Sequence, residues 1–452
     1  MNKIIMPSGA TQILNSLKNN GFDSYVVGGC VRDSLLGLQP KDWDICTSAL
    51  PEQVEEVFKG NRIIETGLKH GTVTIVMEDG QYEVTTFRTD GVYSDCRRPD
   101  NVTFVRNVDD DLARRDFTIN ALAYNGNDQI VDLWGGVDHL RQGVISCVGN
   151  ANDRFNEDAL RIMRALRFAS VYGFAIDEET AKAIHKNAHL LSNIAVERIN
   201  VELCKLLCGK GVLQILLDYN DVITMIIPEF KPCVGFNQNN RYHQYTVYDH
   251  IAHAVDNYKG TDLTVKLALF FHDIGKPTCY TEDENGGHFH GHGVPSRDIT
   301  ETAMQRLRFD NKTQKDVTEL VLYHDSVIEP TPKTVKRWLN KIGQEQLLRL
   351  LDIRMADILA HAEGTQESRV ERCIAVRELM NLIISEEQCF SIKDLSVCGT
   401  DILNLGVPQG KLVGEILSYL LEKVISGDLD NKRDVLMYEV KCYLNAHKSG
   451  EK

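Results

Sequence analysis

A change in hydrophobic periodicity near Gly149 constrains the fold of this chain more than any other feature. Before it, short β-branched or aromatic runs alternate with helical patterns, and we expect strands at 25–27, 43–46, 72–76 and 82–87. From Asn152 onward the sequence follows the 3.6-residue period of helices almost throughout. The pattern predicts an α+β protein, with an N-terminal mixed α/β head followed by an all-α remainder.

Composition excludes several classes of protein. The chain has 452 residues, of which 43% are hydrophobic, so disorder is excluded as its dominant state. No apolar run approaches the roughly 20 residues that a bilayer crossing needs, and the opening segment is not typical of a signal peptide. Dispersed cysteines without a C-x-x-C pair indicate reduced thiols, so we expect a cytoplasmic protein without membrane partners. The net charge of −14 argues against non-specific coating of polyanions, but it allows a local basic groove.

The first chemical cluster lies where a predicted strand runs into Gly28-Gly29 and a short helix begins. Glycines let the backbone approach a ligand closely, and a helix N-terminus favours anions. Arg32 lies within a turn of that terminus, where a guanidinium can fork onto a phosphate. The cluster indicates a phosphate-binding turn.

Two aspartates, Asp42 and Asp44, follow this turn and strengthen the interpretation. On a strand, residues two apart point the same way, so both carboxylates would share a face while Trp43 points to the core. Mg²⁺ is typically held by one or two carboxylates plus substrate phosphates, and Glu83 on a later strand is a candidate third ligand. A solvated turn would explain an isolated Asp-x-Asp, but beside the glycines and Arg32 we favour a metal site.

Arg114 and Arg115 form an adjacent pair amid apolar residues. One interpretation is an exposed pair bridged to Asp110 and Asp111. The other is a clamp on a triphosphate, which suits the planar fork of a guanidinium.

Asp158, Arg161, Arg164 and Arg167 recur every third residue along what the pattern predicts to be one amphipathic helix. A solvated face with weak i,i+3 pairs is possible, but three arginines with one early acid are poorly balanced for it. A carboxylate acceptor beside guanidinium donors would complement cytosine and adenine, which offer an exocyclic amine next to a ring-nitrogen acceptor. Uracil and guanine present the reverse order and would leave buried polar atoms unpaired.

Taken together, these motifs resemble the class II CCA-adding tRNA nucleotidyltransferases of the bacterial poly(A) polymerase superfamily. The motifs that carry the resemblance are Gly28-Gly29 with Asp42-x-Asp44, Arg114-Arg115-Asp116, the segment 132–140 (DLWGGVDHL), Glu157-Asp158-x-x-Arg161 and Glu197-Arg198. The segment 90–104 (DGVYSDCRRPDNVTF) is similar to the family's flexible loop, and 399–417 to its tail. The resemblance implies a nucleotidyltransferase head, a neck of base-recognition helices, a helical body and an RNA-contacting tail, at 1–150, 151–230, 231–390 and 391–452.

The resemblance also implies the reaction and the role of each residue. The reaction is template-independent addition of C, C and A to the 3′ end of tRNA from CTP and ATP, with release of pyrophosphate. Asp42 and Asp44 would hold two Mg²⁺ ions, and Asp158 and Arg161 would read the base. The nucleotide's phosphates and sugar would contact Gly28, Gly29, Arg32, Arg114, Arg115, Arg164 and Arg167.

A second constellation lies in the predicted body, where His272-Asp273 forms the centre of an ordered His/Asp series on predicted helices. The series consists of His250, His272, Asp273, His292, His324 and Asp357. It resembles the HD metal-dependent phosphohydrolase domain. Imidazole and carboxylate ligands suit Mn²⁺, Ni²⁺, Fe²⁺ or Mg²⁺ better than a structural zinc site. An HD fold can persist after its metals are lost, but the full ligand set favours a phosphohydrolase acting on 2′,3′-cyclic or monoester phosphates.

Competing functions remain open at this point. One is a poly(A) polymerase or an A-adding relative in the same superfamily. Another is an HD phosphohydrolase whose head only senses nucleotides, although a sensor would not need both Asp42 and Asp44. Lys333, Lys336 and Arg337 belong to a basic stretch that we interpret first as a solvated face and second as a contact with the RNA backbone. The sequence leaves the oligomeric state open.

Overall fold

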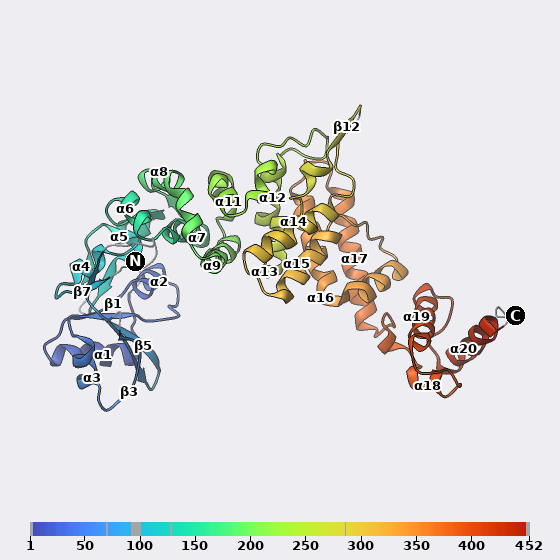
Figure 1. The fold of residues 1–452 in the computed structure, drawn as a ribbon, viewed down its shortest axis with the longest axis horizontal. Coiled ribbons are helices and arrows are strands. Elements are labelled where there is room, and N and C mark those ends of the chain that lie inside the picture. The colour runs from blue at the N-terminus through green and yellow to red at the C-terminus, as the bar shows by residue number, and fades with distance from the viewer. Residues whose placement is uncertain (1–2, 69–70, 92–100, 127–128, 285, 449–452) are drawn as a thin grey trace. The chain divides into compact units, whose positions relative to one another are not determined.

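The computed structural model describes residues 3–68, 71–91, 101–126, 129–284 and 286–448, and these form two compact units. The first unit comprises 1–231 with 306–308, and the second comprises 232–305 and 309–452. The first holds the main sheet and the second is almost entirely helical, so the predicted α+β class is confirmed (Figure 1). The finer division into head, neck, body and tail stays a prediction.

The sheet of the first unit has seven strands in the order β3-β4-β5-β2-β1-β8-β9. Its strands are β1 (Ser24–Val27), β2 (Ile45–Thr47), β3 (Arg62–Gly67), β4 (Thr72–Met77), β5 (Gly80–Thr86), β8 (Leu122–Tyr124) and β9 (Ile130–Asp132). Only β2 and β5 pair in parallel, with Ile45 opposite Val84, and the other neighbours are antiparallel. The parallel pair places the residues before β2 beside those early in β5.

Short helices cover this sheet and connect its strands. They are α1 (Ser8–Asn19), α2 (Gly29–Leu36), α3 (Pro51–Val57) and α4 (Val108–Ala113). Helix α1 packs against β1 and β5, and α2 packs against β1 and β8. Apolar residues of α4 join those of β1 and β2 in a buried cluster that includes Val27, Cys46 and Leu112. A two-stranded ribbon of β6 (Arg88–Asp90) and β7 (Val102–Phe104) flanks the predicted flexible loop, of which 92–100 lie outside the described residues.

Helices continue the first unit beyond the sheet, together with a small parallel pair of β10 (Val144–Ile145) and β11 (Ala175–Ile176). They are α5 (Gly136–Gln142), α6 (Ala151–Glu157), α7 (Leu160–Tyr172), α8 (Glu178–Asn187), α9 (Val196–Leu207), α10 (Val212–Asp218) and α11 (Asn220–Ile226). Helix α7 is the most buried of them and packs along α9. Its arginines are therefore buried or half-buried, and their charges need partners.

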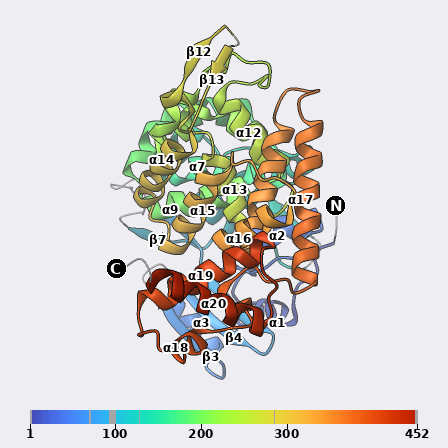
Figure 2. The same ribbon diagram turned by 90° about the vertical axis from the view of Figure 1, so that its right-hand side faces the viewer.

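The second unit begins with a helical bundle and ends in a separate helical cluster (Figure 2). The bundle contains α12 (Val247–Asn257), α13 (Leu263–Phe271), α14 (Gly293–Arg306), α15 (Asn311–Tyr323), α16 (Pro332–Leu359) and α17 (Glu367–Ser385). The terminal cluster contains α18 (Gly399–Leu403), α19 (Lys411–Ser426) and α20 (Arg433–Lys448), which share an apolar core. A hairpin of β12 (Thr281–Asp283) and β13 (Gly286–His288) precedes α14.

Two further predictions can be compared with the described residues. None of their helices combines the length and apolar character that a bilayer crossing requires. The cysteines among these residues are free, as expected of reduced thiols.

Candidate active site and metal cluster

The glycine turn in the head takes the predicted form of a strand, two glycines and a helix. Gly28 follows β1 and precedes α2, with φ of 77° and ψ of −123°, a conformation that strongly favours glycine. A Cβ atom at Gly28 would lie 2.8 Å from Nη1 of Arg115. The turn therefore needs glycine both for its backbone conformation and for the close approach of an arginine.

Asp42 and Asp44 lie just before the interior strand β2, on the segment that bonds to β1 beside this turn. The strand prediction was wrong in its boundary, since β2 begins at Ile45 and both aspartates precede it. The backbone of Asp44 is nevertheless held to β1, because the Val27 N–H donates to the Asp44 carbonyl at 3.0 Å. Both aspartates are exposed, whereas Trp43 and Ile45 are buried. The carboxylates share one face, as the alternation of side chains predicts.

Glu83 joins the two aspartates from the neighbouring strand. Ile45 pairs with Val84 in parallel. Asp44 directly precedes Ile45 and Glu83 directly precedes Val84, so the two acids lie on neighbouring segments of the sheet, and both are exposed. Desolvation raises the pKa of Asp44, repulsion from Glu83 and Asp42 raises it further, and Arg115 opposes both. Carboxylates that repel one another beside a phosphate-binding turn fit a divalent cation, whose charge would remove the repulsion.

Arg32 is held rigidly in the wall of this site. Its side chain is buried, and Nη1 donates to the Asn120 side chain at 2.6 Å. Its guanidinium carbon lies 5.0 Å from the ring centre of Phe168 and 5.1 Å from that of Tyr172. Asp33 pairs with it at 2.8 Å. These contacts fix the plane of the guanidinium and leave it close to the glycine turn, where Gly29 is its neighbour.

Arg114 and Arg115 follow α4 and both pair with Asp111, at 2.8 Å and 3.4 Å. Asp111 is buried, so this is not the exposed surface pair of the first interpretation. Arg115 contacts the glycine turn and acts electrostatically on Asp44, so it belongs to the carboxylate site. Arg114 lies on the opposite side of Asp111, near Asp90.

The predicted continuous helix around Asp158 is wrong, because the chain forms two helices. Helix α6 ends at Glu157, and Asp158 adopts an extended conformation with φ of −136° and ψ of 103°. The Asp158 carboxylate accepts the Leu160 N–H at 3.0 Å, so it stabilises the first turn of α7. The break is a side-chain effect that a hydrophobic period does not reveal.

Asp158 and Arg161 lie close together but bond to different side chains. Asp158 Oδ2 accepts from Arg198 Nη2 at 3.1 Å. Arg161 is buried and pairs with Glu157 at 2.5 Å, and it also donates to the carbonyls of Arg154 and Arg114. Arg198 and Glu157 thus orient the two predicted base-reading side chains. Sequence spacing pointed to the pair but not to these partners.

Arg164 and Arg167 are engaged by carboxylates distant in sequence, which excludes a merely solvated face with i,i+3 pairs. Arg164 donates to Asp116 Oδ2 from Nε at 2.8 Å, and Arg167 pairs with Glu202 at 2.7 Å. Burial raises the pKa of Asp116, but Arg164 and Asn120 outweigh it and lower that pKa well below the usual range. The two ion pairs connect α7 to the head and to α9. Arg164 and Arg167 also lie over the ring of Phe168, which contacts Arg32 of the glycine turn.

The second predicted constellation converges in the bundle of the second unit. His250 lies within α12 and Asp357 within α16, while the others sit at helix ends: His272 and Asp273 after α13, His292 before α14 and His324 after α15. All are buried, at 8% exposure or less. The arrangement brings together every residue that the resemblance to an HD domain implied.

Asp273 stands at the centre of this cluster. Its Oδ2 lies 3.4 Å from His250 Nε2 and 3.2 Å from His272 Nε2, and its Oδ1 lies 3.1 Å from His292 Nε2 and 3.5 Å from His324 Nε2. Asp357 adds a carboxylate 2.9 Å from His250. The two oxygens of one carboxylate therefore face two groups of histidines, each compact enough to surround a cation.

Orphaned polar atoms at the cluster fit a metal. His272 Nε2 and Asp273 Oδ1 are buried and have no hydrogen-bond partner among the described residues, and Asp273 Oδ2 is held by an ion pair with Lys276 at 2.7 Å. Burial disfavours charge on His272, but Asp273 and Asp357 outweigh it and raise its pKa to about 10. Burial lowers the pKa of His250 to about 4, which favours the neutral, ligating form. Such donors suit a divalent cation of the borderline class.

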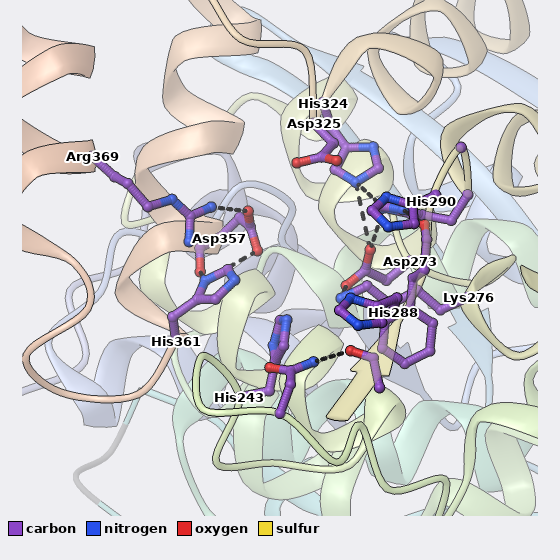
Figure 3. A pocket seen from close by; sticks show the side chains of 15 residues that line it. His243, Asp273, Lys276, His288, His290, His324, Asp325, Asp357, His361 and Arg369 are labelled. Carbon is purple, nitrogen blue, oxygen red and sulfur yellow. Dashed lines mark hydrogen bonds and ion pairs between the residues drawn. The ribbon is translucent and has the colours of Figure 1, made fainter. Parts of the chain in front are cut away.

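A cavity of about 230 Å³ opens over the cluster and contains residues that the sequence reasoning missed (Figure 3). Lys276 lies 2.7 Å from Asp273 Oδ2, and Arg369 lies 3.9 Å from Asp357 Oδ2. His361 Nδ1 donates to the Asp357 carbonyl at 2.8 Å, and His243 lines the same wall. Lys276 and Arg369 place positive charge beside the carboxylates of Asp273 and Asp357. In the sequence, Lys276 follows His272-Asp273 by three positions, but nothing there indicated that its ammonium group would contact Asp273.

Three family models match separate stretches of the chain. Residues 24–146 match the family model of the Poly A polymerase head domain, and 173–233 match the probable RNA and SrmB-binding site of polymerase A. Residues 295–440 match the putative domain 2 of tRNA nucleotidyltransferase. A CCA-adding enzyme of Ligilactobacillus salivarius is 33% identical over 447 residues, which cover 96% of each chain. The chain belongs to the CCA-adding enzyme family.

Further relatives support this membership. A CCA-adding enzyme of Lactobacillus delbrueckii is 53% identical over 210 residues, and that match spans 46% of this chain and 52% of the relative. The crystal structure of the Bacillus stearothermophilus CCA-adding enzyme in complex with CTP is 29% identical and covers 99% of this chain, with a TM-score of 0.74. A Thermotoga maritima CCA-adding enzyme complexed with tRNA shares the fold at 20% identity and a TM-score of 0.61. The chain is therefore a nucleotidyltransferase, an enzyme class that depends on divalent metal.

Proposed function

We propose that this chain adds C, C and A to the 3′ end of tRNA from CTP and ATP, and that the chemistry takes place at Asp42 and Asp44. The observation that carries the assignment is the row of Asp42, Asp44 and Glu83 carboxylates beside the glycine turn and Arg115. Acids on one side and fixed guanidinium groups on the other suit a metal-bound triphosphate. We place the activity in the cytoplasm.

Asp42 and Asp44, with Glu83 as the third ligand, would hold two Mg²⁺ ions. Bound divalent cations there would neutralise the triphosphate and acidify the RNA 3′-hydroxyl. The 3′-hydroxyl releases its proton to solvent and its oxygen forms a bond to the α-phosphorus. The bond from that phosphorus to the bridging oxygen breaks, and pyrophosphate leaves. Arg115 lies beside Gly28 and Arg32 beside Gly29, so their donors, with the backbone of the two glycines, would bind the phosphates.

The remaining arginines position the nucleotide. Arg32 is fixed between the glycine turn and the rings of Phe168 and Tyr172, and it faces the phosphates. Arg164 and Arg167 keep their carboxylate partners, which hold them in place while they contact phosphate or sugar through remaining N–H groups. Arg114 supports Arg115 by sharing Asp111 with it.

Asp158 and Arg161 select the base. Each carboxylate oxygen of Asp158 has a second lone pair after bonding Leu160 or Arg198, so it can accept the exocyclic amine of C or A. Arg161 donates to the adjacent ring nitrogen. Glu157 and Arg198 fix this order of acceptor and donor. In U and G, a base acceptor would therefore face the Asp158 carboxylate and a base donor would face the Arg161 guanidinium.

The deciding experiment supplies tRNA lacking its 3′ end with labelled CTP and ATP, separately and together. We expect C incorporation followed by A, stopping after three nucleotides. Asp42→Ala should lower the rate by roughly 10²–10³-fold or more while CTP binding survives. Glu56→Ala is a control in the same unit, because its exposed carboxylate pairs with Lys59 at the surface. A long A tract would instead support a poly(A) polymerase, and normal incorporation by Asp42→Ala would refute the site.

We propose a second activity for the body, metal-dependent hydrolysis of phosphate esters at the cluster around Asp273. Its support is the pair of histidine groups facing the two oxygens of that carboxylate, with orphaned polar atoms pointing inward. Chelator-free protein should carry a divalent metal, whether Mn²⁺, Ni²⁺, Fe²⁺ or Mg²⁺, and should hydrolyse 2′,3′-cyclic nucleotides. His272→Ala should abolish that hydrolysis and leave CCA addition intact. Metal-free protein that stays inert after metals are added would remove this activity.

A further inference from the structure

A second cavity adjoins the one over the metal cluster. It has a volume of about 400 Å³ and is lined by Tyr242, His243, Asp325, Val327, Arg354, His361, Arg369 and Arg372. His243, Asp325, His361 and Arg369 also line the first cavity. The two hollows therefore share a wall, which in Figure 3 includes His243, His361 and Arg369.

The charge of the second cavity is strongly positive. Three arginines line it, and Asp325 is the acid that accompanies them. Arg354 comes from α16, one turn before the metal-cluster residue Asp357, and Arg369 and Arg372 lie one turn apart on α17. Helical spacing thus directs guanidinium groups from two helices into one hollow.

These arginines are weakly neutralised. Arg354 Nη1 is buried and has no hydrogen-bond partner among the described residues. Arg372 lies 3.6 Å from Glu329 in a pair that is exposed on both sides, and Arg369 lies 3.9 Å from Asp357. A buried guanidinium nitrogen without a partner is unfavourable, and a phosphate would satisfy it with charge-assisted bonds. The cavity therefore has the chemistry of an anion site.

Tyr242 suggests which anion is bound. Tyr242 is 42% exposed, and the guanidinium carbon of Arg241 lies over its ring at 4.9 Å from the ring centre. An aromatic ring beside basic groups is a typical surface for a nucleobase and its phosphate. The metal cluster would act on one phosphate, and the arginines would contact another on the same molecule.

We propose that the second cavity binds the phosphate that precedes the terminal nucleotide, so that the body acts on the 3′ end of an RNA strand rather than on free mononucleotides. This inference rests on the proposed phosphohydrolase function of the cluster. For a 2′,3′-cyclic end, a water oxygen bonds to phosphorus and the bond to one ribose oxygen breaks. That ribose oxygen takes the proton which water loses, leaving a monoester.

The test compares 2′,3′-cyclic CMP with a trinucleotide that ends in the same cyclic phosphate. Wild-type protein should show a higher kcat/KM for the trinucleotide. In Arg354→Gln/Arg372→Gln this preference should fall at least roughly tenfold, since each charge-assisted contact has about that effect. Arg297→Gln on α14, whose arginine pairs with the exposed Asp298 outside both cavities, should keep the preference. Thermal melting checks folding, and the single Arg372→Gln variant serves if the double variant unfolds.

Failure of this inference and failure of the hydrolase function give different results. Hydrolysis of both substrates with no preference in wild type, or with an unchanged preference in the double variant, overturns the phosphate site. If neither substrate is hydrolysed after divalent metal is added, the hydrolase function fails. Fluorescence anisotropy with a 3′-phosphorylated trinucleotide then tests whether the second cavity binds phosphate. Weaker binding by the double variant supports the phosphate site, and equal binding refutes it. A phosphoserine peptide that competes equally well would refute the nucleic-acid assignment.

Discussion

The pair of Asp116 and Arg164 allows a quantitative test of how the head is joined to α7. Asp116 is 8% exposed, and its carboxylate accepts from Arg164 at 2.8 Å and 2.5 Å, from Asn120 at 3.0 Å and from the Phe117 N–H at 2.8 Å. In Arg164→Gln the carboxylate stays buried without its cation. Breaking a buried pair in this way lowers the free energy of unfolding by roughly 3–5 kcal/mol. Because the Arg164 side chain is 34% exposed, we expect a loss of about 2–3 kcal/mol.

The pH dependence of this effect has a definite sign. Arg164 holds the folded-state pKa of Asp116 below its ordinary value, so the pair adds stability above the unfolded-state pKa of about 4. That stability is lost as pH falls below about 4 towards the folded-state pKa. The difference in unfolding free energy between wild type and Arg164→Gln should therefore be largest near neutral pH and shrink in acid.

Urea denaturation followed by tryptophan fluorescence measures this difference in the first unit. In a Trp338→Phe background, the remaining tryptophans are Trp43 and Trp134, both in the first unit. Asp116→Asn and the double variant complete a cycle, for which we expect a coupling of about 1–3 kcal/mol. Arg141→Gln, at an exposed pair with Asp138, should change stability by less than about 0.5 kcal/mol. A loss under about 0.5 kcal/mol in Arg164→Gln, or a loss independent of pH, would refute the reasoning.

Other positions give further predictions. Gly28→Ala should lower the free energy of unfolding by about 1–3 kcal/mol, because alanine is strained at φ of 77°. The added methyl group should also displace Arg115 and weaken CTP binding, and unchanged binding in a titration would contradict the close approach of Arg115 to Gly28. Asp44→Asn should abolish nucleotide addition but slightly raise the melting temperature. The rise is expected because the charged Asp44 is desolvated beside like charges, which raise its pKa, and a lower melting temperature would contradict this electrostatic account. Adding Mn²⁺ to chelator-treated protein should raise the melting temperature of the second unit, and His272→Asn should reduce that rise; an equal rise in both proteins would place the metal elsewhere.

The carboxylate site shows how far local pattern reaches. Alternation along 42–45 predicted that Asp42 and Asp44 would share a face opposite the buried Trp43, because side-chain direction along an extended segment depends only on the backbone. The same rule misplaced the start of β2, since strand assignment depends on neighbours from other segments. Glu83 was a weaker candidate, because its position beside Asp44 depends on the parallel pairing of β2 with β5.

The sequence by itself determined the α/β head, the helical remainder and the acidic face at Asp42 and Asp44, because each follows from local periodicity or residue type. The members of the cluster around Asp273 came from the resemblance to an HD domain. Tertiary structure alone decided the distant partners of the buried charges: Arg164 with Asp116, Arg167 with Glu202, and Asp158 with Arg198. It also decided that Arg354 and Arg372 line one hollow beside the metal cluster. A buried charge takes whichever opposite charge the packing brings within reach, and packing joins segments whose separation along the chain carries no signal of their contact.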